Sequence, residues 1–204
     1  EADTLTTTAT LETGGTASLT TRSGNLSNSG TVDAAAILTI ASAGDLTTAG
    51  ALTAGLTGTL TGTGANVFNS GPLGSSVDDV TLTTVGNITN TGLIYSGADL
   101  WLNLDGALQN NGADIIAERG ITIVGASDAR ATSVLNRSAN IEAITGSILI
   151  AAAVVENSQP IPNVVPETTV TTREGAAADF PNISHPENTS RVVEITTTTR
   201  MVAH

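Results

Sequence analysis

Apolar and polar positions recur in blocks about every twenty-one residues between Leu5 and Val155. The clearest block is an apolar residue, then any residue, then usually Asn. Successive blocks begin 20 or 21 residues apart, except for one step of 26. The apolar residues that open the blocks are Leu5, Leu26, Leu46, Val67, Ile88, Leu108, Val134 and Val155. A repeat of this length is typical of a solenoid.

Two further apolar columns have the same period. One follows the block by six residues, or by seven in two repeats, and comprises Leu11, Val32, Leu52, Leu73, Ile94, Ile115 and Ile141. The other precedes the block and comprises Leu19, Ile40, Leu60, Leu82, Leu102, Ile123 and Ile150. Three columns with one period predict that each repeat stacks on the next and buries the same side chains.

Each repeat has the local pattern of short strands. Triplets such as Leu38-Thr39-Ile40 and Leu100-Trp101-Leu102 place apolar residues two apart, which is the alternation of a strand with one buried side. No helical spacing extends over ten residues, so a leucine-rich repeat fits less well. We therefore predict an all-β fold: a parallel β-helix (solenoid) of about eight rungs with a short C-terminal β-hairpin-like appendage. Parallel crossovers favour a right-handed coil.

The residues that close each block predict two structural features. Stacked rungs would align the amides of Asn28, Asn69, Asn90, Asn110, Asn136 and Asn157 in a ladder, with hydroxyls at Thr7 and Thr48. Glycines follow the block at Gly30, Gly50, Gly71, Gly92 and Gly112. We expect these glycines to serve corners where a positive φ is convenient.

The repeat pattern divides the chain into residues 1–158, the β-helix, and residues 159–204, a different region. Pro160, Pro162 and Pro166 interrupt regular pairing. Residues 168–172 and 191–198 have strand composition, and we predict that they pair antiparallel and pack on the rod or cap its end. Because the repeat is already under way at Glu1, without a signal peptide, we expect a piece of a longer array.

Composition narrows the classes of partner. The net charge is −12, cysteine is absent, and no apolar run is long enough to cross a membrane. An acidic chain disfavours nucleic acid, whose phosphates require Lys and Arg. Thiolate metal sites are excluded, and His185 and His204 are a weak metal signal. The residues predict no cofactor and no metal site.

Candidate functional residues are few. Tyr95 and Trp101 alternate with inward residues, so they should face outward and either contact a partner or lie beneath the C-terminal segment. Asp128 and Arg130 belong to an insertion, residues 125–130, that lengthens one repeat and could bind a partner or be solvated. These four residues form our candidate interaction surface.

An enzyme is the rival class, because glycoside cleavage needs two nearby carboxylates. Stacking could bring Asp79 near Asp99, and other pairs are Asp78 with Asp79, Asp99 with Asp105, and Asp114 with Glu118. No Arg or His accompanies Asp79 and Asp99 at a similar phase of the repeat. We therefore interpret these carboxylates as solvated corner residues and predict no catalytic residue.

The repeats also carry a family resemblance. Gly86-Asn87-Ile88-Thr89-Asn90-Thr91-Gly92, and the later run from Asn136 to Ala143, resemble the haemagglutinin repeats of two-partner-secretion exoproteins. This family includes filamentous haemagglutinin and the contact-dependent growth-inhibition exoproteins. The resemblance covers about residues 5–158. It implies export by an outer-membrane partner transporter and a secreted filament on the surface of a Gram-negative bacterium.

The same resemblance implies a function. We expect a structural stalk used for adhesion or for contact-dependent toxin delivery to neighbouring bacteria, with a target-cell receptor as a further partner. The alternatives are a β-helical polysaccharide lyase or hydrolase and an adhesin that binds through the side of the rod.

Overall fold

The structure, a computed structural model, describes residues 2–55, 60–127, 130–159, 164–175 and 192–203. Within these residues every regular element is a strand. The chain forms two compact units, Glu1–Pro160 and Ile161–His204. The predicted all-β class is therefore confirmed, and the first unit contains the whole repeat region.

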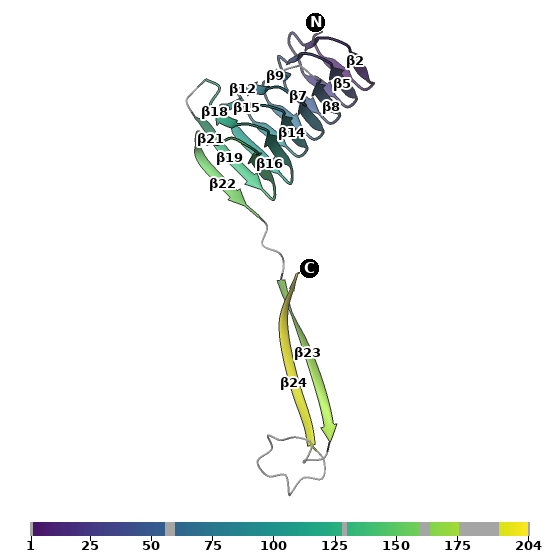
Figure 1. Ribbon diagram of the computed structural model, residues 1–204, viewed down its shortest axis with the longest axis vertical. Helices are drawn as coiled ribbons and strands as arrows, with labels where there is room; N and C mark the ends of the chain where they lie inside the picture. Colours follow the sequence, from purple (N-terminus) through teal and green to yellow (C-terminus); the bar gives the residue numbers. More distant parts are fainter. Residues whose placement is uncertain (1, 56–59, 128–129, 160–163, 176–191, 204) are drawn as a thin grey trace. The chain divides into compact units, whose positions relative to one another are not determined.

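Three parallel sheets make up the first unit (Figure 1). The first sheet contains β1 (Leu5–Thr7), β4 (Leu26–Asn28), β7 (Leu46–Thr48), β10 (Val67–Asn69), β13 (Ile88–Asn90), β16 (Ala107–Asn111), β19 (Ala131–Arg137) and β22 (Ala152–Ser158). The second contains β2 (Leu11–Thr13), β5 (Thr31–Ala34), β8 (Ala51–Ala54), β11 (Pro72–Ser75), β14 (Leu93–Ser96), β17 (Asp114–Ala117) and β20 (Asn140–Ala143). The third contains β3 (Ala17–Thr20), β6 (Leu38–Ala41), β9 (Leu60–Gly64), β12 (Val80–Thr84), β15 (Leu100–Leu104), β18 (Ile121–Val124) and β21 (Ile148–Ile150).

The chain visits the three sheets in turn, so each repeat is one turn of a β-solenoid. Each strand pairs in parallel with the strand three positions earlier in the chain, which lies one turn away. For example, Leu26 aligns with Leu5 on one side and with Leu46 on the other. The unit therefore has seven complete turns, and β22 adds an eighth strand to the first sheet. The predicted β-helix, with about eight rungs, is confirmed.

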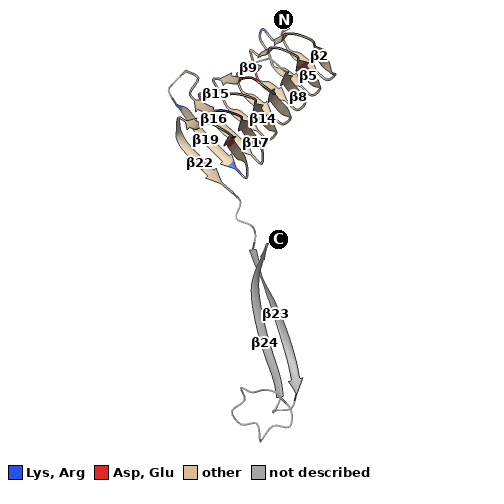
Figure 2. Ribbon diagram, viewed as in Figure 1, with Lys and Arg blue, Asp and Glu red and all other residues tan. Residues whose placement is uncertain are grey.

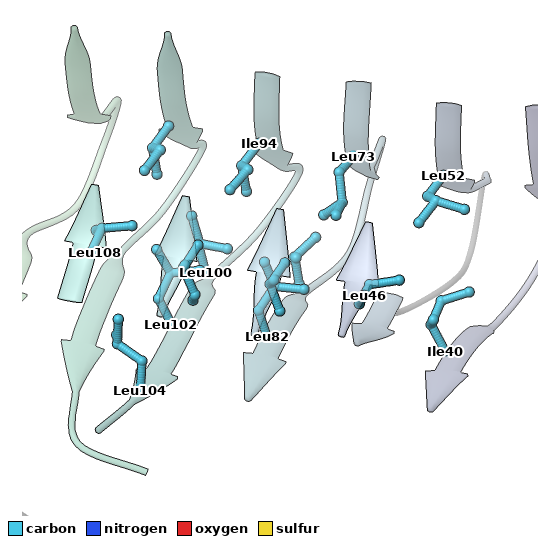
Figure 3. Packing of buried hydrophobic residues seen from close by; sticks show 14 of the residues in the cluster. Ile40, Leu46, Leu52, Leu73, Leu82, Ile94, Leu100, Leu102, Leu104 and Leu108 are labelled. Atoms are coloured by element: carbon cyan, nitrogen blue, oxygen red, sulfur yellow. The ribbon is translucent and has the colours of Figure 1, made fainter. Parts of the chain in front are cut away.

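The core is a set of axial rows of buried side chains. Leu52, Leu73 and Ile94 follow one another along the axis on the second sheet (Figure 3), and each is at most 1% exposed. Leu46 and Leu108 face them from the first sheet, and Leu82 and Leu102 from the third. Because each turn has a single layer, its inward side chains are covered mainly by the turns before and after it.

One member of the predicted columns was wrong. Leu60 does not align with Ile40 and Leu82; the residue at that position is Gly62, and Leu60 aligns with Leu38 and Val80 instead. A Cβ on Gly62 would lie 2.8 Å from Leu82 Cδ2. The Leu82 side chain therefore occupies the space that an apolar residue at position 62 would need.

The reason expected for the corner glycines was also wrong. Of the five glycines that follow the block, only Gly112 has a positive φ, of 60°. At Gly50 an added Cβ would lie 1.8 Å from the carbonyl oxygen of Gly30, and at Gly92 it would lie 2.4 Å from that of Gly71. Glycine is needed there because successive corners touch along the axis, so that a side chain would overlap the backbone one turn below.

The second unit contains two long strands, β23 (Val164–Gly175) and β24 (Val192–Ala203). They pair antiparallel over twelve residues each, from Val164 opposite Ala203 to Gly175 opposite Val192. The pairing includes the predicted strand segments, apart from Arg191, and extends beyond them. The expectation that Pro166 interrupts regular pairing was wrong, because Pro166 lies within β23, opposite Met201. Pro160, Pro162 and both histidines lie outside the described residues.

Candidate functional site

The predicted amide ladder lies on the inner face of the first sheet, at the position two residues after the apolar residue that opens each block. Asn69 Nδ2 donates to Asn90 Oδ1 at 2.7 Å, Asn90 Nδ2 to Asn110 Oδ1 at 2.8 Å, and Asn110 Nδ2 to Asn136 Oδ1 at 2.8 Å. Asn136 Nδ2 donates in turn to Asn157 Oδ1 at 2.9 Å. Each of four consecutive turns is thus connected to the following turn by a side-chain hydrogen bond along the axis.

The same amides also bind the backbone of the adjoining corner. Asn28 Nδ2 donates to Ala51 O, Asn69 Nδ2 to Leu93 O, and Asn110 Nδ2 to both Ala113 O and Asn140 O. Buried carbonyl groups need such donors because no water reaches them. The ladder therefore satisfies the corners between the first and second sheets as well as itself.

The ladder is interrupted at Thr48. Asn28 Nδ2 approaches Thr48 Oγ1 at 3.4 Å, but the Thr48 hydroxyl donates to Gly50 O at 2.8 Å. Asn69 Oδ1, the next acceptor along the axis, is buried and has no hydrogen-bond partner. At Thr7 the hydroxyl does serve the ladder, since it donates to Asn28 Oδ1 at 2.6 Å.

A second ladder, which the sequence analysis missed, lies at the corners between the third and first sheets. The side-chain oxygen of one Asn accepts the backbone N–H one turn further on: Asn25 from Asp45, Asn66 from Asn87, and Asn87 from Ala107, at 2.8–2.9 Å. A glycine precedes each of these three donors, and a Cβ there would lie 2.2–2.4 Å from the Asn oxygen. The recurring Gly-Asn and Gly-Asp pairs were the available signal.

The candidate catalytic carboxylates Asp79 and Asp99 do lie one above the other, at the corner between the second and third sheets. Asp79 Oδ1 accepts Asp99 N–H at 3.0 Å, and Asp99 Oδ1 accepts Gly120 N–H at 2.8 Å. The expectation that no Arg accompanies them was wrong, because Arg119 Nη2 lies 3.3 Å from Asp79 Oδ1 and 3.4 Å from Asp99 Oδ2. Backbone amides and one guanidinium together hold both carboxylates in a structural network.

Three of the other candidate carboxylates also have local partners. Asp78 Oδ1 accepts Asp79 N–H, Asp105 Oδ1 accepts Ser127 N–H, and Glu118 Oε1 accepts the Tyr95 hydroxyl at 3.1 Å. Charged residues are sparse along the coil (Figure 2). Among the described residues, no three His, Cys, Asp or Glu side chains gather as metal ligands would.

Three of the four predicted interaction residues lie among the described residues, on different parts of the coil. Tyr95 lies on β14 of the second sheet, Trp101 lies on β15 of the third, and both are half-buried on the outer side of their strands. Arg130 is exposed just before β19, and Asp128 lies outside the described residues. Burial of the Tyr95 hydroxyl, followed by its hydrogen bond to Glu118 and the charge of that carboxylate, raises the pKa of Tyr95.

The last turn differs from those before it, because its apolar residues are accessible. Val155 is 56% exposed and Ile148 is 42% exposed, whereas Ile88 and Leu100, in the same rows, are fully buried. A hollow of about 170 Å³ is lined by Val155 and Ile148 together with Val134 and Ile141. Within the described part of the chain, β22 is the edge of its sheet.

No model of a known protein family matches the chain, and neither a curated protein nor a solved structure matches it. In the described residues, no helix has the length and apolar character needed to cross a membrane. The fold therefore defines the protein as a parallel β-solenoid.

Proposed function

We propose that this chain is a structural stalk segment of a secreted exoprotein on the surface of a Gram-negative bacterium, which serves adhesion or contact-dependent toxin delivery. The observation that carries the proposal is the unbroken parallel pairing from the first turn to the last. The resemblance to haemagglutinin repeats supplies the cellular setting.

A stalk must resist bending, and this coil has three kinds of axial bonding. Strand pairing joins adjacent turns, the amide ladder runs along the first sheet, and the corner side chains accept backbone N–H groups one turn away. Eight strands spaced by about 4.8 Å give a coil roughly 34 Å long. Further turns of the same kind would lengthen such a rod without changing its cross-section.

Export through an outer-membrane partner transporter suits a chain of this design. The strands of each turn pair only with those of the adjacent turns, so folding can proceed turn by turn as residues emerge from a pore. A receptor on the target cell is the second partner that the proposal implies. The contacts of Asp79 and Asp99 with Arg119 favour a structural role for them over polysaccharide cleavage.

The proposal is tested on cells that produce the protein. Antibodies raised against the 204-residue chain should label intact cells, and external protease should remove the label. Deleting the partner transporter should abolish surface labelling while the protein accumulates inside. Labelling that requires permeabilised cells, with the transporter present, would contradict the proposal.

A further inference from the structure

A groove of about 360 Å³ crosses the outer face of the second sheet, between β5 and β14. Its lining includes Asp33, Thr53, Pro72, Gly74, Leu93 and Tyr95, and most of the lining surface is apolar. This volume falls in the range of small-molecule sites, roughly 300–1,000 Å³. No structural role described above uses the groove.

The hollow originates at Gly74. Residues 33, 53, 74 and 95 are aligned on adjacent strands, so they form one axial row on the outer side of the sheet. Gly74 leaves a gap in this row between Thr53 and Tyr95, which are two strand spacings apart, about 9.6 Å. A Cβ on Gly74 would lie 2.3 Å from the carbonyl oxygen of Tyr95. The gap is therefore built into the close approach of β11 and β14.

The two ends of the gap differ in chemistry. At one end is the Tyr95 ring, whose hydroxyl is anchored to Glu118, with Pro72 and the 38% exposed Leu93 beside it in the neighbouring row. At the other end Thr53 Oγ1 donates to Asp33 Oδ1 at 2.8 Å. That bond orients the Asp33 carboxylate and leaves its remaining lone pairs available to accept hydrogen bonds.

A ligand that fits must have an apolar face and hydroxyl donors at its edge. The C–H face of a hexose suits the negative face of an aromatic ring and the adjoining apolar side chains. Its hydroxyl groups suit a carboxylate acceptor. Asp33 is the acidic lining residue, and no Lys or Arg is among the described residues that line the groove, so the groove disfavours anionic ligands. We propose that this groove binds a neutral hexose unit of an oligosaccharide, with Tyr95 as the stacking residue and Asp33 as the hydroxyl acceptor.

The proposal can be tested on the full chain because Tyr95 is the only tyrosine in the sequence. With ¹³C-labelled tyrosine, every tyrosine ring signal in an NMR spectrum belongs to this site. The probes are maltose, cellobiose and lactose, with a disaccharide of uronic acid as the anionic comparison. We expect saturable shifts of the Tyr95 signals with at least one neutral sugar and none with the uronic-acid sugar.

Variants then identify the contacts by calorimetry. Asp33→Asn should weaken the affinity at least fivefold, Tyr95→Phe should retain most of it, and Tyr95→Ala should abolish it. Trp101→Ala, which removes an aromatic ring from the third sheet, is the matched control and should leave binding unchanged. Because Asp33 is partly exposed at the surface, its variant reports on the site even if Tyr95→Ala disturbs the fold.

Two results would overturn the inference. One is an unchanged Tyr95 spectrum with all three neutral sugars at millimolar concentration. The other is equal loss of binding in Trp101→Ala and Asp33→Asn, which would place the sugar elsewhere. Neither result bears on the stalk proposal, because the coil is the same with or without a ligand.

Discussion

Two stretches of the amide ladder in the first sheet have the same backbone arrangement but differ in how their side chains form hydrogen bonds. From Asn69 to Asn157 every amide donates to the next amide along the axis. From Thr7 to Thr48 a single Asn lies between two threonines, and the bond from position 48 to position 69 is missing. The backbone register is the same in both stretches, so the stacking does not depend on any single ladder bond.

The difference follows from the number of donors on each side chain. A hydroxyl has one hydrogen, and Thr48 uses it on Gly50 O, so nothing remains for Asn69. An amide has two N–H donors, and Asn69 binds both Asn90 and Leu93 O. A ladder that bonds along the axis and also to the corner therefore needs Asn at each position.

The largest effect is expected from removing an amide within the continuous stretch. Asn110→Ala removes the donor to Asn136 Oδ1, the acceptor of the Asn90 amide, and one donor to each of the carbonyl groups of Ala113 and Asn140. Each unsatisfied buried group costs about 1–3 kcal/mol, so the free energy of unfolding should fall by roughly 3–5 kcal/mol. Urea denaturation of the full chain measures this loss.

The matched control is the neighbour Gln109, which faces outward on the same strand. Gln109→Ala should change the free energy of unfolding by less than about 0.5 kcal/mol. A loss below about 1 kcal/mol in Asn110→Ala would show that the ladder contributes little.

Repairing the interrupted stretch should have a smaller, opposite effect. Thr48→Asn supplies an amide that can donate to Asn69 Oδ1, which now lacks a partner. The free energy of unfolding should rise by about 1 kcal/mol, the net value of a buried hydrogen bond. Thermal unfolding monitored by circular dichroism checks this, with the outward Thr47→Asn as control. A lower midpoint temperature of unfolding for Thr48→Asn than for the parent chain would contradict the view that Asn69 Oδ1 lacks only a donor.

A smaller loss of stability is expected at the second ladder, which lies at the corners between the third and first sheets. Asn87→Ala removes the acceptor of Ala107 N–H, but the site is exposed and water can replace the side chain. The cost should be about 0.5–1 kcal/mol, well below that of Asn110→Ala. Urea denaturation of Asn87→Ala and Asn110→Ala side by side gives the ratio of the two losses in the free energy of unfolding. Equal losses would contradict the distinction between the amide ladder and the second ladder.

The smallest effect concerns pH at the accessible last turn. Hydrogen bonds from Arg137, then from Ser158, lower the pKa of Glu156. A lowered folded-state pKa stabilises the fold above the unfolded-state pKa, and this contribution is lost as pH falls through the folded value. In Arg137→Ala the pKa of Glu156 should rise, as measured by NMR titration of its carboxyl carbon. An unchanged titration would mean that the ion pair does not persist in solution.

The sequence predicted the stacking because strand alternation and the repeat length are both local patterns. Leu60 was misplaced because Leu60 and Gly62 lie two residues apart in a Thr- and Gly-rich run. The hydrophobic pattern favours the apolar residue for the column, but the strand register places Gly62 there. Arg119 was missed as a partner of Asp79 because it lies 40 residues away, two turns along the axis. The corner glycines were misread because axial contact between corners depends on how closely turns approach, which no single repeat reveals.

The measurement that tests the central claim most directly is a distance along the axis. Ser27 and Leu135 lie in one outward row of the first sheet, five strand spacings apart. Since the chain has no native cysteine, spin labels can be attached at Ser27→Cys and Leu135→Cys alone. Pulsed electron resonance should give a narrow distribution centred near 24 Å between the two backbone sites, after allowance for the label arms. A broad distribution, or a centre more than about 10 Å longer, would contradict a stiff stack of turns spaced by one strand separation.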